Sequence, residues 1–305
     1  MKNAEQEKMT AALNSVVAAV FLTGMKLVVG LMSGSLGILA EAAHSGLDLG
    51  AALVTYFAVR ISGKPADQKH LYGHGKVENL SAFFETVLLL VTCIWIIHEA
   101  YERLVVKPMA VEASIWAFAV MVISIGVDIS RSRMLYRVAH KHNSQALEAD
   151  ALHFSTDIWS SAVVLFGLFC VKIGDWFPAV GFLQRADALA ALGVALIVVH
   201  VSVKLGIRTI EGLLDVAPAG MAETIKFLVE SMNEIKDCHA VRVRTSGPRL
   251  FVDVHVSLDG NMPLKQVHQL TDQVEERVQQ TIPNADVTVH PEPSNSPTVD
   301  PKNGG

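Results

Sequence analysis

The sequence predicts an α-helical membrane protein with six transmembrane helices and a small C-terminal cytoplasmic α+β domain. Hydrophobic residues make up 51% of its 305 residues and charged residues only 18%, which is too apolar for an ordinary soluble domain. Six apolar segments each have about the 20 residues that cross the hydrocarbon core of a bilayer. Beyond about Leu213 the pattern becomes that of a soluble domain with the order α-β-β-α-β.

The six apolar segments are separated by polar loops and turns. They run over residues 11–32, 36–61, 80–104, 114–135, 146–173 and 186–207. We therefore assign residues 1–212 to the transmembrane domain, 213–293 to the cytoplasmic domain and 294–305 to a disordered tail rich in Pro, Ser, Asn and Gly.

The distribution of basic residues predicts the orientation in the membrane. One set of loops and helix ends carries Lys2, Lys8, Arg60, Lys64, Lys69, Lys76, Arg131, Arg133, Arg137, Lys141, Lys204 and Arg208. The other set carries Arg103, Lys107, Lys172 and Arg185. Because Lys and Arg concentrate in short cytoplasmic loops, we expect both termini in the cytoplasm.

The C-terminal part shows the periodicities of a two-layer domain. Apolar residues recur at helical spacing over residues 221–232 and 264–281. Apolar and polar residues alternate over 240–245 and 250–258, and a last short strand is expected over 286–290.

Composition also excludes several classes of protein. The net charge of −5 leaves no basic footprint for nucleic acid. Cys93, Cys170 and Cys238 are widely spaced, so they form neither a disulfide framework nor a Cys-x-x-Cys zinc motif.

Two copies of a His-x-x-x-Asp pattern lie in the second and fifth apolar segments, as His44 with Asp48 and His153 with Asp157. Residues four apart share one face of a helix, so each pair can aim an imidazole and a carboxylate at one point. Two such pairs on facing helices would form an N2O2 cage that suits tetrahedral Zn²⁺. The competing interpretation is a set of interhelical hydrogen bonds without metal, although ionisable residues inside a membrane are usually functional.

A second candidate site lies in the loop between the second and third segments. Asp67, His70 and His74 offer one carboxylate and two imidazoles at spacings of three and four, which suit a turn wrapped around one ion. Gly73 and Gly75 flank His74 and indicate a specified backbone geometry. The alternative is a solvated loop with incidental histidines.

Over residues 9–293 the chain resembles the cation diffusion facilitators, a family of metal-ion/proton antiporters. The stretches that carry the resemblance are GSLGILA at 34–40, PADQKHLYGHGKVE at 65–78 and SQALEADALH at 144–153. The resemblance implies a transport site at His44, Asp48, His153 and Asp157, and a loop site at Asp67, His70 and His74. It also implies a homodimer joined through the C-terminal domain.

The resemblance further implies a binuclear metal site in the C-terminal domain. The matching positions are His239, His255, His268, His290 and Glu292. From the residues alone, His255 and His290 lie on the polar faces of their strands, where they could converge. Lys76 and Asp215 match a charged pair with which the family joins its membrane and soluble parts.

Some bacterial members of the family carry Asp at the position of His44. With two histidines and two aspartates, this chain resembles the zinc-transporting branch instead. That branch often has a His-rich loop between the fourth and fifth helices, whereas here this loop is only residues 137–143, with His140 and His142.

The sequence thus predicts a secondary transporter of a bacterial inner membrane, and no enzyme. It would export a divalent metal, Zn²⁺ first and Cd, Fe, Co, Ni or Mn as alternatives, in exchange for protons. An intramembrane metallohydrolase would need an open coordination position and a general base, but four protein ligands close the site and no His-Glu-x-x-His occurs. A membrane-anchored sensor that reads cytoplasmic metal is the remaining alternative.

Overall fold

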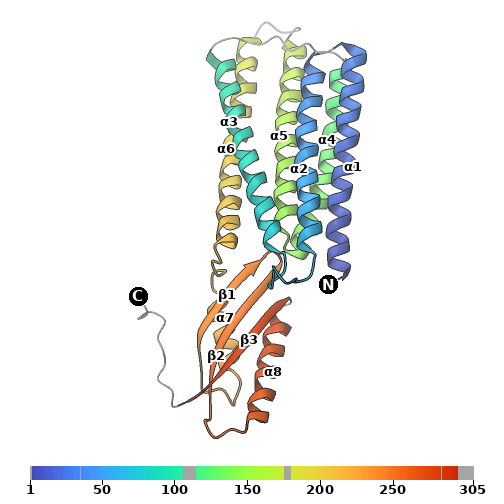
Figure 1. Cartoon of the computed structure of the whole chain (residues 1–305). Coiled ribbons are helices and arrows are strands. Elements are labelled where there is room, and N and C mark those ends of the chain that lie inside the picture. The colour runs from blue at the N-terminus through green and yellow to red at the C-terminus, as the bar shows by residue number, and fades with distance from the viewer. Residues whose placement is uncertain (1, 35, 106–114, 175–179, 283, 295–305) are drawn as a thin grey trace. The chain divides into compact units, whose positions relative to one another are not determined.

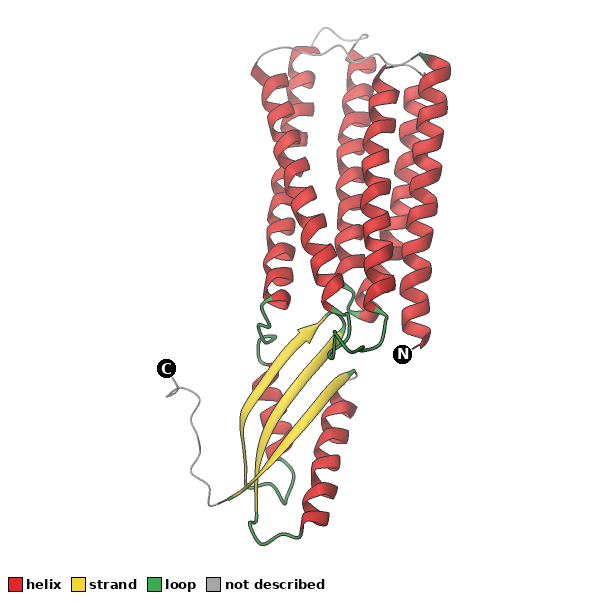
Figure 2. Cartoon of the chain, viewed as in Figure 1, coloured by secondary structure: helices red, strands yellow, loops and turns green. Residues whose placement is uncertain are grey.

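A computed structural model describes residues 2–34, 36–105, 115–174, 180–282 and 284–294 of the chain. The chain divides into two compact units, residues 1–209 and 210–305. The first is built of helices, and the second contains the strands (Figure 2). Residues 295–305 of the predicted disordered tail, and most of the predicted loop around Pro108, lie outside the described residues.

Six long helices account for the six apolar segments. They are α1 (Lys2–Ser33), α2 (Leu36–Ser62), α3 (Lys76–Val105), α4 (Ile115–His142), α5 (Gln145–Gly174) and α6 (Val180–Leu213). Each extends past its predicted segment at the end expected to be cytoplasmic. Hydropathy detects only the apolar part of a helix, whereas backbone hydrogen bonding continues into the polar flank.

The helical unit has apolar side chains outside and polar side chains inside. On α1, Val17 is 60% exposed and Leu31 66%, whereas Ser15 and Lys26 are buried. Exposed apolar surface on this scale marks contact with lipid. Three described stretches are long and apolar enough to span a bilayer, namely Asn3–Ser33, Lys76–His98 and Leu192–Leu213.

Helices α2, α4 and α5 also carry acidic residues that face the polar interior, among them Asp48, Asp128 and Asp157. Within the unit α1 packs on α2 and α4, α4 on α5, and α5 on α2 and α3 (Figure 1). A core cluster between α1, α4 and α5 combines Leu135, Leu147 and Phe154 with several alanines. Small residues at these contacts let the backbones approach closely.

The C-terminal unit has the predicted order α-β-β-α-β. Its elements are α7 (Met221–Glu230), β1 (Asp237–Ser246), β2 (Arg249–Leu258), α8 (Leu264–Thr281) and β3 (Ala285–Pro293). The sheet order is β1-β2-β3, with β1 antiparallel and β3 parallel to β2. Val252, Val254 and Val256 of β2 are buried with residues of both helices, which leaves the other face of the sheet for polar side chains.

The two outer strands are longer than the sequence predicts. β1 begins at Asp237 rather than at residue 240, and β3 runs over Ala285–Pro293 rather than 286–290. Hydrogen bonds to β2 extend both strands regardless of side-chain pattern. The register of β1 also shifts between His239 and Arg242, and such a bulge interrupts the alternation from which a strand is recognised.

Candidate metal centres

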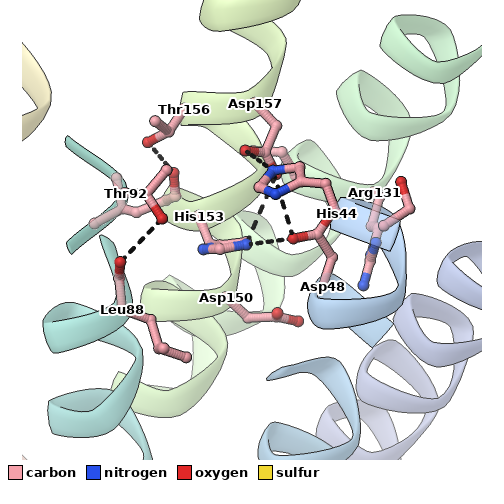
Figure 3. A network of polar contacts seen from close by, with 12 residues as sticks. His44, Asp48, Leu88, Thr92, Arg131, Asp150, His153, Thr156 and Asp157 are labelled. Atoms are coloured by element: carbon pink, nitrogen blue, oxygen red, sulfur yellow. Dashed lines mark hydrogen bonds and ion pairs between the residues drawn. The ribbon is translucent and has the colours of Figure 1, made fainter. Parts of the chain in front are cut away.

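The second and fifth helices bring three of the four predicted membrane ligands together (Figure 3). His153 Nε2 lies 3.1 Å from Asp48 Oδ1 and 3.8 Å from Asp157 Oδ2. Ligand atoms of all three residues lie within 4.8 Å of one another. In a tetrahedral zinc site, bonds of about 2.0–2.2 Å place ligand atoms roughly 3.3 Å apart, so small side-chain movements would close this set around an ion.

His44, the fourth predicted ligand, lies at the edge of this group. Its Nε2 is 3.9 Å from Asp48 Oδ1 and 3.9 Å from Asp157 Oδ1. Its side chain is 31% exposed, whereas that of His153 is 7% exposed. The repeated spacing of four therefore places both imidazoles beside the same two carboxylates, with His153 deeper in the bundle.

A cavity of about 80 Å³ opens beside these ligands. A water needs on the order of 10–15 Å³ of such volume, so the cavity has room for an ion. His44, Asp48 and Asp157 line it, together with charged residues that the sequence analysis did not select as ligands, which are Lys26, Glu41, Asp128 and Arg131. Arg131, which the charge distribution placed among the loops and helix ends, is instead buried in the bundle with 3% exposure. These charged residues lie inside apolar segments of the sequence, and that position could have identified them as functional candidates.

Two of these additional charges are held by hydrogen bonds. Lys26 Nζ donates to Ser45 Oγ at 2.8 Å and to Glu41 Oε2 at 3.2 Å. Arg131 Nε donates to Ser15 Oγ at 2.7 Å. The membrane ligands therefore belong to a larger buried network of acidic and basic groups.

The loop between α2 and α3 gathers its three predicted ligands. Asp67 Oδ1 lies 3.2 Å from His70 Nδ1, and Asp67 Oδ2 lies 3.3 Å from His74 Nε2. The two imidazole rings are 4.3 Å apart between centroids. Gly73 adopts a φ of 78°, a conformation that glycine adopts at little cost, and this turn places the imidazole of His74 back against Asp67.

The backbone of the loop stabilises the ionised form of Asp67. Its Oδ1 accepts the backbone N–H of His70 at 2.7 Å and that of Lys69 at 2.8 Å. These two hydrogen bonds lower the pKa of the Asp67 carboxyl below its ordinary value. The carboxylate is therefore available as a ligand throughout the neutral and mildly acidic range.

Three histidines lie in a row across the C-terminal sheet. The register pairs His239 with His255 between β1 and β2, and His255 with His290 between β2 and β3. Glu292, two residues after His290 and on the same face of β3, completes the group. Its carboxylate lies 2.8 Å from His255 Nδ1, 3.4 Å from His239 Nε2 and 3.7 Å from His290 Nε2.

The hydrogen bond with His255, together with the other two imidazoles, lowers the pKa of Glu292. His239, His255 and Glu292 place ligand atoms within 4.8 Å of one another. His268 does not join them within one chain. It lies on α8 with a side chain 77% exposed, and its Nδ1 is 3.6 Å from Asp272 Oδ1.

The predicted interlocking pair, Lys76 and Asp215, falls in different units of the chain. Asp215 has a positive φ of 60°, and its Oδ2 lies 4.0 Å from Arg244 Nη1 within the C-terminal unit. Contact of Asp215 with Lys76 stays a prediction.

Comparison with known proteins agrees with this architecture. Residues 12–214 match the model of the cation efflux transmembrane domain, and residues 218–294 match that of the cytoplasmic domain of cation efflux proteins. The cation-efflux pump FieF of Klebsiella pneumoniae (strain 342) is 31% identical over 286 residues, which cover 93% of this chain and 92% of the relative.

FieF of Serratia proteamaculans (strain 568) is 31% identical over 285 residues, and FieF of Cronobacter sakazakii (strain ATCC BAA-894) is 30% identical over 284 residues. In both cases the match covers 93% of this chain and 92% of the relative. A solved structure of a proposed zinc transporter, CzrB, covers 27% of this chain and 93% of that chain at 26% identity, with a TM-score of 0.26. That score is too low to support an argument about the fold.

The matched transmembrane domain covers the six-helix unit, and the matched cytoplasmic domain covers the α+β unit. The chain is therefore an integral membrane protein and belongs to the cation diffusion facilitator family.

Proposed function

We propose that this cation-efflux protein exports a divalent transition metal, with Zn²⁺ as the favoured substrate, from the cytoplasm in exchange for protons. The observation that supports this most directly is the group of Asp48, His153 and Asp157 beside His44, in which His153 is buried and the two aspartates are largely shielded. Two carboxylates and two imidazoles offer a divalent cation charge neutralisation and four donor atoms. Nitrogen and oxygen donors in a set of four suit tetrahedral Zn²⁺.

Proton exchange follows from the chemistry of the same ligands. Imidazole binds a metal only in its neutral form, and a carboxylate only when ionised, so metal and protons compete for the group. Histidine titrates near neutral pH. A modest pH difference across the membrane therefore changes metal affinity, and helix movements that expose the group to one side and then the other would couple the two flows.

The proposal also covers the membrane, the orientation and the assembly of the transporter. We place it in a bacterial inner membrane, with both termini and the loop and C-terminal metal groups in the cytoplasm. We also propose a homodimer joined through the C-terminal domain, as the resemblance to the family implies, and the match of residues 218–294 to the family's cytoplasmic domain supports this. Because His268 does not reach the sheet ligands within one chain, its predicted role as a ligand would require a second copy.

Cd, Fe, Co, Ni and Mn are the alternative substrates. Divalent affinities rise towards Cu²⁺ at most nitrogen and oxygen sites, so affinity alone does not select zinc. A membrane-anchored metal sensor is the second candidate function, because the loop and sheet groups both lie outside the membrane helices.

Metal flux into liposomes tests the proposal. Purified protein should accumulate Zn²⁺ inside vesicles when a pH gradient is imposed, and uptake should stop when an ionophore collapses the gradient. A sensor would bind zinc without moving it. Zinc binding without flux in any pH gradient would contradict the transporter and favour the sensor.

A further inference from the structure

A second polar layer lies next to the membrane ligands, towards the N-terminus of α5. Its charged members are Glu85 of α3, Arg131 of α4 and Asp150 of α5, which are 1%, 3% and 0% exposed. Asp150 precedes the ligand His153 by three residues, an axial rise of about 4.5 Å along the helix. Figure 3 shows Asp150 one turn from His153, with Arg131 across the site.

Hydroxyl groups of two further helices complete the layer. Ser15 of α1 donates to Asp150 Oδ2 at 2.9 Å and accepts from Arg131 Nε at 2.7 Å. Thr55 of α2 donates to Glu85 Oε1. Five helices thus contribute a polar side chain to one buried layer.

This layer leaves hydrogen-bonding capacity unused. Glu85 Oε2, Asp150 Oδ1 and Arg131 Nη2 are buried, and none of them has a hydrogen-bond partner among the described residues. Buried polar atoms in proteins are nearly always paired. Each of the two carboxyl groups therefore has one free buried oxygen that can carry a proton.

The balance of charges in the layer also favours one bound proton. One guanidinium neutralises one carboxylate, and Arg131 also faces Asp128 in the ligand cavity. The charged groups that act on Glu85 are Asp150 and Arg131. Those acting on Asp150 are Arg131, His153 of its own helix and Asp48 of α2.

Two buried carboxylates that interact electrostatically in a low-dielectric interior do not both remain ionised at little cost. The layer approaches neutrality when Glu85 and Asp150 hold one proton between them.

We propose that Glu85 and Asp150 form a proton-binding site of their own, separate from the metal ligands, which gives up its proton when metal binds one turn away. A divalent cation between Asp48 and His153 adds positive charge beside the pair, so metal binding favours the ionised pair. The proton leaves to solvent as the metal binds, and returns when the metal leaves. This inference rests on the proposed metal/proton exchange and adds a proton that no metal ligand carries.

The test counts the protons that full-length protein releases when it binds Zn²⁺ in weakly buffered detergent solution. Glu85→Gln and Asp150→Asn should each release about one proton fewer per zinc, and their zinc affinity should change about tenfold less per pH unit. Glu85→Asp, which keeps the carboxyl, should restore the wild-type count. Glu102→Gln is the matched control, because Glu102 lies on the same helix with a side chain 57% exposed, and should match the wild type.

Wild-type proton counts and pH slopes in both Glu85→Gln and Asp150→Asn would overturn the proposal. If neither variant folds, infrared difference spectra of the wild-type protein decide. A protonated-carboxyl band should disappear on zinc binding and shift in Glu85→Asp, and its absence from zinc-free protein would overturn the proposal. Counting protons on binding needs no transport, so failure of the transporter proposal would appear separately, as absent flux in liposomes.

Discussion

The membrane group and the sheet group bring similar ligand atoms together by different means. In the membrane, Asp48, His153 and Asp157 come from two helices and are mostly buried among other charges. On the sheet, the register of three strands sets His239, His255 and His290 side by side around the carboxylate of Glu292. The first group has two carboxylates in a low-dielectric interior, and the second has one beside solvent.

The two groups therefore suit different roles. Charges in the membrane interior interact strongly and must be balanced, so the proposed binding of metal and of protons would be coupled there. At the sheet, solvent screens the same charges. Metal bound there would hold strands or chains together with less effect on the proposed ion path.

The largest difference in transport between the two groups is expected when one carboxylate is removed from each. Asp157→Ala should abolish zinc transport. Loss of a residue that only hydrogen-bonds to a metal ligand already lowers metal affinity by up to roughly 100-fold, and loss of an anionic ligand itself should lower it further. Glu292→Ala removes the matching carboxylate from the sheet and should leave measurable flux. Liposome uptake assays compare the two variants. Near-wild-type flux in Asp157→Ala would remove the distinction between the two groups.

The identity of the ligand at position 44 should set selectivity in the membrane group alone. His44→Asp adds a third carboxylate, so the variant should keep transport, accept Mn²⁺ and Fe²⁺ more readily and bind metal down to lower pH. Competition assays with Zn²⁺, Cd²⁺, Fe²⁺ and Mn²⁺ measure both effects. Identical ion rankings and pH midpoints would show that His44 only packs against a neighbouring helix.

Loss of the central histidine of the sheet should affect assembly more than transport. His255→Ala breaks the closest contact of Glu292, at 2.8 Å, and should weaken the zinc-dependent tightening of the dimer while some flux remains. Sedimentation of the full chain with zinc and with chelator measures this. His98→Ala, an exposed histidine of α3, is the control, and the same zinc dependence in both variants would argue against a role for the sheet group.

The loop group is intermediate between the membrane group and the sheet group. It is exposed to solvent, but backbone N–H groups hold the carboxylate of Asp67. Since the pKa of Asp67 is lowered, its stabilising contribution is present above the unfolded value of about 3.9 and is lost only as pH falls through the lower folded value. The Asp67 carboxylate should therefore remain ionised and available as a ligand down to at least about pH 4. Infrared difference spectra of an Asp157→Ala, Glu292→Ala double variant with and without Asp67→Asn should show no protonated-carboxyl band from Asp67 above that pH, and such a band would contradict the prediction.

The smallest effect is expected from the loop backbone. Gly73→Ala places a side chain at a φ of 78°, which should cost roughly 1 kcal/mol and weaken zinc binding at the loop about fivefold. Gly75→Ala is the matched control, because Gly75 is not among the positive-φ glycines of the described chain. Equal losses of affinity in calorimetry would mean that the turn does not position His74.

Much of this architecture is local in origin and was therefore predictable. Apolar length predicts each membrane helix because the bilayer requires about 20 apolar residues. The spacing of four places His153 and Asp157 on one face of α5 because helical geometry is regular. Alternation along residues 250–258 likewise predicts which face of β2 is buried, as Val254 and His255 illustrate.

Three features depended on the tertiary structure. The extension of β1 to Asp237 arises from pairing with β2 across a bulge, which no local pattern reveals. The placement of His268 away from the sheet ligands follows from the packing of α8 on the opposite face of the sheet. The layer of Glu85, Arg131 and Asp150 exists only because α3, α4 and α5 pack together. Sequence determined the elements and their faces, since these follow from local geometry, whereas the partners of a buried charge depend on which distant helix packs against it.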